Sequence, residues 1–335
     1  MRDRPEPVTM ATIARMAGVT QPTVSRAFNH PARLSPETLD RIMQAVRQTG
    51  YVPNIVAGGL ASSRSRVLAA IVPSVVNITY VALIRTFSAI MRQRGYQVML
   101  MESGFDATEE ERLVALSLAH RPEGILLTGI QHSEQCRRML VASGIPVVEV
   151  WDLTRSPVDV CVGFSHEGAA RAAARHMLSR GYRHFATAAV DDARAIRRNL
   201  AFAQELRANG HACRMGRDLP GLPSIRSGRA AFARLIEDGL PIGQSAIFCS
   251  SDVMAQGVMI EARARSIEIP REVAVMGFGD QDHAADLDPP LTTIRIDRDA
   301  LGQRAAEALI ARIDRQDVPE RRIDIGFTIV ERNSL

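Results

Sequence analysis

Side chains with paired hydrogen-bonding groups lie in one short segment, residues 20–29. Gln21 and Arg26 carry groups that match the edges of DNA base pairs, and the Thr and Ser hydroxyls of the segment can reach phosphate oxygens. At helical spacing these polar residues share one face, while Val24 and Phe28 turn inward. The chemistry that this segment could perform is therefore the reading of base edges in a major groove.

Two short helices are expected to position this face. Apolar residues recur at helical spacing in Met10–Ala17 and Thr20–Asn29, and only Gly18-Val19 separates the two segments. So short a link makes two helices cross steeply, as in a helix-turn-helix, with Thr20 as N-cap of the second. A third helix should begin after Ser35 and end at Gly50. A bundle of this kind need not bind anything, so geometry alone leaves a purely structural role open.

Basic charge is concentrated at the start of the chain. Residues 1–66 hold nine Arg against four acidic residues, or +5, whereas residues 67–335 hold 32 against 33, or −1. All 41 basic residues are Arg, which excludes chemistry that needs a lysine. A basic segment on a nearly neutral body is typical of a protein that binds a polyanion.

The same region carries a longer pattern. Ala14–Asn29 reads AxxAGVTxxTVSRxxN, and SPET at 35–38, GYVPN at 50–54 and the pair Ala57 and Leu60 follow. In this fixed register over about fifty residues, the chain resembles the LacI/GalR family of bacterial repressors. The resemblance implies double-stranded operator DNA as a partner. The residues expected at the DNA are Thr9, Thr20, Gln21, Pro22, Thr23, Ser25, Arg26, Asn29, Arg33, Tyr51, Asn54, Ala57 and Leu60.

The resemblance also implies a hinge helix after residue 54. In the family this helix enters the minor groove and wedges a leucine between base pairs, and Leu60 stands at that position. Gly58-Gly59 lies inside it, and each glycine costs a helix about 1 kcal/mol relative to alanine. We expect the hinge to order only on DNA; a simple linker is the alternative.

Beyond residue 66, apolar strand-like runs alternate with helical stretches. The first series of runs covers 67–73, 97–102, 124–128 and 146–150, and the second covers 184–190, 246–250 and 273–278. Continuous apolar strands joined by helices indicate parallel sheets that are covered on both faces, and two series indicate two α/β lobes with a cleft between them. Further segments are expected as follows: a crossing between lobes at Leu291–Ile294, a long helix at Asp297–Gln316 and a final strand at Ile323–Val330.

The predicted fold class is thus α followed by α/β. The resemblance implies a periplasmic-binding-protein-like core of two doubly wound parallel sheets, between which the chain crosses three times. The expected domains are a headpiece at 1–53, a hinge at 54–66, a first lobe at 67–163 and 294–323, and a second lobe at 164–293 and 324–335. Because no heptad tail follows, a homodimer is expected rather than a tetramer.

A small-molecule effector should bind where the strand ends of the two lobes face each other. Arg binds a carboxylate or phosphate through paired hydrogen bonds, Asp accepts from hydroxyls, and Trp offers a surface for stacking, so a polyhydroxylated and anionic ligand is favoured. The candidate contacts are Tyr80, His132, Glu149, Trp151, Arg198, Asp252, Asp280 and Asp282. Gln131, Asp152, Arg197 and Ser251 lie in the same segments.

Each candidate has a structural alternative, such as a surface salt bridge for Arg198 or core packing for Trp151. The chain also departs from the family's effector pattern. The family's effector-binding pattern is Arg-x-x-Gly-aromatic, and here Ala201 stands at the glycine position, three residues after Arg198. In the family's Asn-Asp pair, Ser251 replaces the Asn before Asp252. Gly279 stands where many sugar-binding members have Asp. His166 is interpreted as structural.

Within the family, the body looks most like the gluconate-utilisation repressors. The segments that carry this likeness are 95–105, 124–132, 144–153, 162–177 and 323–329. A sugar acid such as gluconate, or a related aldonate or its phosphate, is the effector that this likeness implies. An inducer would release the operator; a corepressor with another effector would use the same parts and is the alternative.

Two other classes of protein are less compatible with the sequence. A solute-binding protein would suit the body, but no apolar leader is visible and a basic headpiece precedes the core. An enzyme would need a catalytic motif, yet no GxSxG, GxGxxG or HExxH occurs. A regulator without catalytic residues, cofactor or metal is therefore expected.

The remaining features concern compartment. Cys136, Cys161, Cys213 and Cys249 show no CxxC spacing, so they are interpreted as free thiols in a reducing compartment rather than as a zinc site or disulfide framework. The uncharged run 67–84 has the length of a membrane span, but Pro73 and several polar residues interrupt it. A cytoplasmic, nucleoid-associated protein without membrane contact is expected.

Overall fold

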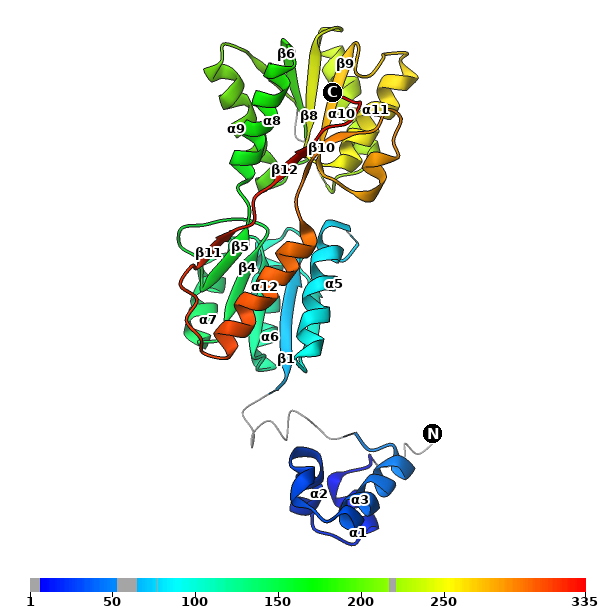
Figure 1. The fold of residues 1–335 in the computed structure, drawn as a ribbon, viewed down its shortest axis with the longest axis vertical. Helices are drawn as coiled ribbons and strands as arrows, with labels where there is room; N and C mark the ends of the chain where they lie inside the picture. The colour runs from blue at the N-terminus through cyan, green and yellow to red at the C-terminus, as the bar shows by residue number, and fades with distance from the viewer. Residues whose placement is uncertain (1–6, 53–64, 77, 217–220) are drawn as a thin grey trace. The chain divides into compact units, whose positions relative to one another are not determined.

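The computed structural model describes residues 7–52, 65–76, 78–216 and 221–335 (Figure 1). Contacts divide the chain into two compact units, Met1–Ser65 and Arg66–Leu335. We call their described parts the headpiece and the core unit. Among the described residues, no helix combines the length and apolar character that a bilayer crossing requires.

The headpiece is a three-helix bundle. Its helices are α1 (Met10–Ala17), α2 (Gln21–Asn29) and α3 (Pro36–Thr49), with a 3₁₀ turn at Pro31–Arg33. Thr9 and Ser35 cap α1 and α3 by accepting from backbone N–H groups three residues on, each at 3.3 Å. Ile13, Val24 and Ile42, one from each helix, are fully buried where the helices meet. The expected helix-turn-helix is thus formed.

The core unit contains two six-stranded sheets. The first has the order β11-β5-β4-β3-β1-β2 and the second the order β12-β10-β9-β8-β6-β7. In the first, the strands are β1 (Val67–Val72), β2 (Gln97–Glu102), β3 (Gly124–Thr128), β4 (Val147–Val150), β5 (Val160–Gly163) and β11 (Arg322–Asp324). In the second, they are β6 (His184–Ala188), β7 (Cys213–Met215), β8 (Ser245–Cys249), β9 (Val273–Gly279), β10 (Thr292–Arg295) and β12 (Thr328–Val330). All pairings are parallel except that of β10 with β12.

Helices cover both faces of each sheet. The first lobe has α5 (Ile78–Gln93), α6 (Ala107–Ala119), α7 (Glu134–Ser143) and α12 (Arg298–Ile313). The second lobe has α8 (His166–Ser179), α9 (Ala193–Ala208), α10 (Ile225–Glu237), α11 (Asp252–Ala264) and a short turn at Asp282–Ala285. On β1, Leu68 and Ala70 pack toward α5 and α12, which lie side by side (Figure 1), while Ala69 and Ile71 pack toward α6 and α7. This alternation explains why β1 reads as an unbroken apolar run.

The chain passes between the sheets three times: after β5, after β10 and between β11 and β12 (Figure 1). Two predictions are wrong here. Leu291–Ile294 does not cross; its residues 292–294 belong to β10 inside the second sheet, and the crossing follows it. Ile323–Val330 is not one strand but parts of β11 and β12, because Gly326 at φ +69° breaks the run and its N–H bonds to Asp324 Oδ1 at 2.9 Å.

Besides β10, two strands escaped prediction, and both are short. Strand β5 has four residues and β7 has three, so neither presents a run that stands out from its surroundings. The four cysteines are free thiols; Cys136, Cys161 and Cys249 are buried and Cys213 is partly exposed.

Candidate functional site

Helix α2 presents the polar face that its sequence predicts. Gln21, Pro22, Arg26 and Asn29 are exposed, and Thr23 and Ser25 are half-exposed. Val24 and Ala27 are buried against the other helices. No acidic residue occurs between Glu6 and Glu37, so neither α2 nor the segments that flank it in the sequence carry a carboxylate side chain. A face of this composition can approach phosphates and base edges without charge repulsion.

Hydrogen bonds hold several of these side chains in place. Thr20 lies at the N-cap of α2, but its hydroxyl pairs with that of Thr23 at 2.9 Å and makes no bond to the helix backbone. Asn29 Nδ2 donates to Ser25 Oγ at 3.3 Å. Both pairs link residues one turn apart on the face that is expected to meet DNA.

The other expected DNA contacts are placed less uniformly. Thr9 and Arg33 are exposed, whereas Tyr51 is half-buried and packs on Phe28, with ring centroids 6.3 Å apart. Phe28 itself is half-buried rather than fully inward. Three further residues of the expected set lie outside the described part of the chain: Asn54, Ala57 and Leu60.

In the core unit, a cavity of about 300 Å³ lies between the two lobes. Its walls from the first lobe include Ser103, Glu110 and Gln131, which lie at or beyond the C-terminal ends of β2 and β3. Its walls from the second lobe are the segment 191–194 and Arg197. The volume is at the lower end of the range of about 300–1,000 Å³ for small-molecule sites.

Three arginines of helix α9 dominate the second-lobe wall. Arg194 and Arg197 line the large cavity, and Arg194 and Arg198 line an adjoining cavity of about 80 Å³. Their spacing of three and four residues places all three on one helix face. Arg194 Nη1, Arg197 Nε and Arg198 Nε are buried and have no hydrogen-bond partner among the described residues. Such donors leave room for an acceptor from a ligand.

Other donors of these arginines are occupied. Arg194 Nη2 donates to Tyr80 Oη at 2.9 Å, Arg197 forms an ion pair with Asp152, and Arg198 Nη2 donates to the Ser250 carbonyl at 3.1 Å. Burial, together with the charge of Arg194, lowers the pKa of Arg198 to about 10, although the carboxylate of Asp192 opposes the shift. An added negative charge nearby would therefore be stabilised.

Aromatic rings form the wall of the smaller cavity. Tyr80, Trp151 and Phe278 all line it. Trp151 packs edge-on against Tyr80 at 5.7 Å and against Phe164 at 5.4 Å, and it adopts a left-handed backbone, φ +78°. The Arg198 guanidinium lies 4.2 Å above the Phe278 ring. Trp151 is only 5% exposed, so packing and cavity lining are combined in one residue.

His166 links this wall to the arginines. Its Nε2 lies 3.0 Å from the Trp151 carbonyl and its Nδ1 lies 2.9 Å from Arg198 Nη1. Arg can only donate, so Nδ1 accepts and the proton is on Nε2. Burial, reinforced by the charges of Arg198, Arg194 and Arg197, lowers the pKa of His166 well below its usual range. The neutral ring is a structural connector between Trp151 and Arg198, in agreement with the prediction from sequence.

Five of the expected effector residues do not line these two cavities. Asp252 is fully buried and accepts from Thr293 Oγ1 and the Gln281 N–H. Asp280 forms ion pairs with Arg295 and Arg332. Asp282 has an exposed side chain. The other two are His132 and Glu149.

His132 and Glu149 belong to a buried cluster in the first lobe. His132 Nδ1 lies 2.7 Å from Glu110 Oε1, and Nε2 lies 3.2 Å from Glu149 Oε1. Burial disfavours the charged imidazole, but the two carboxylates outweigh it and raise the pKa of His132 to about 9. Only Glu110 of this cluster reaches the cavity wall.

Sequence reasoning missed Arg194, which lines both cavities. The signal was available, because Arg194 precedes Arg197 and Arg198 by one helical turn. Phe105 and Asp192 were missed as well. Both lie in loops whose approach to the cavity depends on the arrangement of the lobes.

A helix-turn-helix with an exposed polar face, followed by a two-lobed core with a cavity between the lobes, defines a ligand-responsive, DNA-binding transcriptional regulator. Residues 9–54 match the family of bacterial regulatory proteins known as the lacI family, and residues 174–335 match a periplasmic binding protein-like domain. The chain belongs to the lacI family.

Several relatives match nearly the whole chain. The HTH-type transcriptional regulator GntR of Pseudomonas aeruginosa is 36% identical over 97% of this chain and 95% of its own length. A lacI-family transcriptional regulator from Silicibacter pomeroyi is 30% identical, with a TM-score of 0.91 over 98% of this chain and 99% of that one. The transcription regulator GntR from Chromobacterium violaceum is 33% identical, with a TM-score of 0.73 over 80% of this chain and 98% of that one.

Proposed function

We propose that this regulator is a homodimeric repressor that a sugar acid such as gluconate releases from a pseudo-palindromic operator. The observation that carries the proposal is the group of three arginines on one face of α9, each with a buried N–H that has no described partner. Such donors suit the carboxylate of a ligand.

The rest of the cavity lining supports a ligand that also carries hydroxyl groups. Asp152, Asp191 and Asp192 line the large cavity beside Arg194 and Arg197. Carboxylates accept from hydroxyls, so a chain of hydroxyls ending in a carboxylate matches both kinds of wall. The likeness to the regulators named GntR points in the same direction.

At the DNA, we propose that Gln21 and Arg26 read bases and that the Thr and Ser hydroxyls bind phosphates. The proposal is supported by their position on the exposed face of α2. Two copies of this face are needed for a two-fold symmetric operator, which is why a dimer is part of the proposal. Light scattering of the protein with and without a palindromic duplex tests the dimer.

Effector and operator would be coupled through the arrangement of the lobes. A ligand that favours one arrangement over the other by about 1–3 kcal/mol changes operator affinity about 5- to 150-fold. Binding without turnover is proposed as well, since the relatives reported above are transcriptional regulators. A turnover assay with sugar acids tests this point separately.

The deciding experiment is calorimetry of the full-length protein against gluconate, 6-phosphogluconate, 2-ketogluconate and a neutral hexose. We expect saturable binding of a sugar acid and release of a fluorescent operator by the same compound. Arg194→Gln should weaken this binding, because it removes a donor that lines both cavities.

Arg207→Gln is the matched control, since Arg207 lies exposed in the last turn of the same helix. Equal affinity in wild type and Arg194→Gln would refute the arginine assignment. Binding of the neutral hexose alone, or of none of the four compounds, would refute the sugar acid and leave the family assignment standing.

A further inference from the structure

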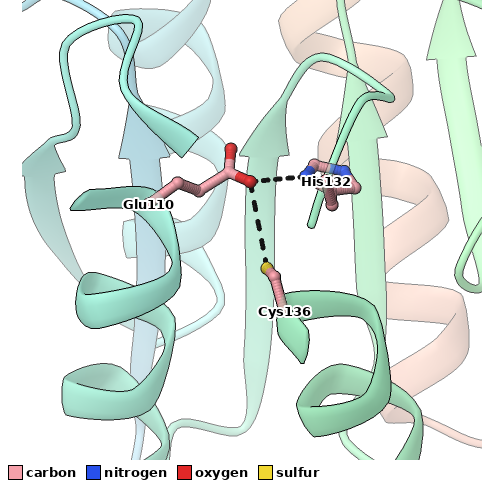
Figure 2. Close-up of side chains that lie close together, drawn as sticks. All are labelled: Glu110, His132 and Cys136. Atoms are coloured by element: carbon pink, nitrogen blue, oxygen red, sulfur yellow. Dashed lines mark hydrogen bonds and ion pairs between the residues drawn. The ribbon is translucent and has the colours of Figure 1, made fainter. Parts of the chain in front are cut away.

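Three side chains from different elements converge in the first lobe (Figure 2). Glu110 comes from the first half of α6, His132 from the loop after β3, and Cys136 from the first turns of α7. One oxygen, Glu110 Oε1, lies 2.7 Å from His132 Nδ1 and 3.8 Å from Cys136 Sγ. The donor atoms of the three residues all lie within 4.8 Å of one another.

These donors are shielded from solvent. The side chains of His132 and Glu110 are 1% and 12% exposed, and Cys136 is fully buried. Burial of this kind distinguishes the cluster from the exposed acidic groups that gather by chance on protein surfaces. Glu110 nevertheless lines the 300 Å³ cavity, so the cluster lies at the cavity wall and can be reached from it.

The charges around the cluster do not balance. Glu110 and Glu149 flank His132 on its two ring nitrogens, and Glu111 lies one residue further on, held by Ser133 Oγ at 2.6 Å. Even with a protonated imidazole, three carboxylates leave a net charge of −2. Among the described residues, no arginine forms an ion pair with any of the three. Buried charges in proteins are paired or coordinate metals, so buried carboxylates without an arginine partner favour a cation at this place.

We propose that Glu110, His132 and Cys136 bind a divalent transition metal of the zinc class. Carboxylate oxygen, imidazole nitrogen and thiolate sulfur are the three donor types that zinc takes in proteins. Glu110 lines the cavity, from which a water molecule would supply the fourth ligand of a tetrahedron. The inference concerns the first lobe alone and does not rest on the proposed sugar-acid effector.

The geometry is close to what such a site needs. Bonds of about 2.0–2.3 Å in a tetrahedron place donor atoms about 3.3–3.6 Å apart. The Glu110–His132 separation of 2.7 Å is shorter than this range, the Glu110–Cys136 separation of 3.8 Å is slightly longer, and all three donor atoms lie within 4.8 Å of one another. Metal binding therefore requires side-chain movements of up to about 1 Å. On binding, the metal replaces the proton between Glu110 and His132 and the proton of the Cys136 thiol, and both protons pass to water.

Glu149 would act as a positioning residue. Its Oε1 lies 3.2 Å from His132 Nε2, while its Oε2 is fixed by the Val158 N–H at 2.6 Å. His132 would bind the metal through Nδ1. A carboxylate beside Nε2, on the other side of the ring, keeps the ring in the orientation that directs the Nδ1 lone pair at the metal. Losing such a partner weakens metal affinity about 10- to 100-fold.

The test is a titration of the full-length, chelator-treated protein with Co²⁺ as a spectroscopic probe. We expect one Co²⁺ per chain, a near-ultraviolet thiolate-to-cobalt charge-transfer band, and loss of the band when Zn²⁺ is added. Cys136→Ser should abolish the band. Cys161→Ser, in the same lobe and equally buried, and Cys213→Ser, the most exposed thiol, are the matched controls and should retain it.

Two further variants keep the test decisive if Cys136→Ser folds poorly. Glu110→Gln, at the cavity wall, should weaken Co²⁺ binding, and Glu149→Gln should keep the spectrum while lowering the affinity about 10- to 100-fold. The proposal is overturned if no band saturates at one equivalent, if Cys136→Ser leaves the band unchanged, or if Cys213→Ser removes it. The last result would identify an adventitious thiol complex.

Discussion

Asp252 offers a test that separates support of the fold from contact with a ligand. It lies at the first position of α11, fully buried. Its Oδ1 accepts from Thr293 Oγ1 at 2.5 Å and its Oδ2 accepts from the Gln281 N–H at 2.6 Å. One carboxylate thus joins the start of α11 to strand β10 and to the loop after β9. We expect Asp252→Ala to destabilise the core unit strongly and Asp252→Asn to do so weakly.

The magnitudes follow from the groups left behind. Alanine removes a hydrogen bond to a charged acceptor, about 1.5–3 kcal/mol, and leaves the Gln281 N–H buried without a partner, about 1–3 kcal/mol. It also removes a negative charge at a helix N-terminus, about 0.3–1 kcal/mol. These contributions add up to about 3–7 kcal/mol. Burial raises the pKa of Asp252, so removing its desolvated charge offsets part of the cost, and we expect a total of about 3–5 kcal/mol. Asparagine keeps an acceptor for Gln281 and can donate to Thr293, so about 1–2 kcal/mol is expected.

Trp151 makes the measurement direct, because it is the only tryptophan and is buried in the core unit. Its fluorescence during urea unfolding reports this unit alone, and the midpoints give the differences in stability if the slope is unchanged. Sugar-acid affinity should change less than about threefold in Asp252→Asn, or about 0.65 kcal/mol. A cost below about 1 kcal/mol for Asp252→Ala would refute the anchoring argument. So would loss of ligand binding in a fully stable Asp252→Asn.

The sequence was a good guide to the elements that repeat a simple pattern. The helix-turn-helix and the strands β1, β2, β3, β8 and β9 were predictable, since each is a run of suitable residues with a turn at both ends. The final segment was not, because its two halves join different sheets. That division depends on Gly326 and on long-range pairing with β5 and β10, which no local pattern records.

For the cavities between the lobes, sequence reasoning identified the strand ends that line them but not the direction of each side chain. Glu149 lies in β4 and Trp151 directly follows it, while Asp252 comes shortly after β8. Trp151 lines a cavity, but the carboxylates of Glu149 and Asp252 point into buried hydrogen-bond networks. Carboxylates are equally suited to accept from ligand hydroxyls and from backbone N–H groups, so residue type alone cannot separate the two roles. The metal-binding cluster was hidden for another reason: its ligands, Glu110, His132 and Cys136, are 22 and 4 residues apart and match no common zinc spacing.

Three further predictions concern the DNA face, the core and pH. Arg26→Ala should weaken specific operator binding by about 1–3 kcal/mol if Arg26 reads a base, whereas an equal loss on random DNA would make it a phosphate contact. Gly277→Ala should destabilise the core unit by about 1–3 kcal/mol in urea unfolding, because the added Cβ would lie 2.2 Å from Asp252 Oδ1; wild-type stability would contradict this contact. Finally, the core unit should lose stability as the pH falls below about 6.5. His166 has a lowered pKa in the folded protein, so below the ordinary pKa of about 6.5 the unfolded chain takes up a proton that the native chain does not. This contribution is complete above pH 6.5 and is lost by up to about 1.4 kcal/mol per pH unit below it. The slope of unfolding free energy against pH should therefore flatten in His166→Gln. It should persist in His120→Gln, a control at an exposed histidine. Equal slopes in both variants would show that His166 is not the source of the pH dependence.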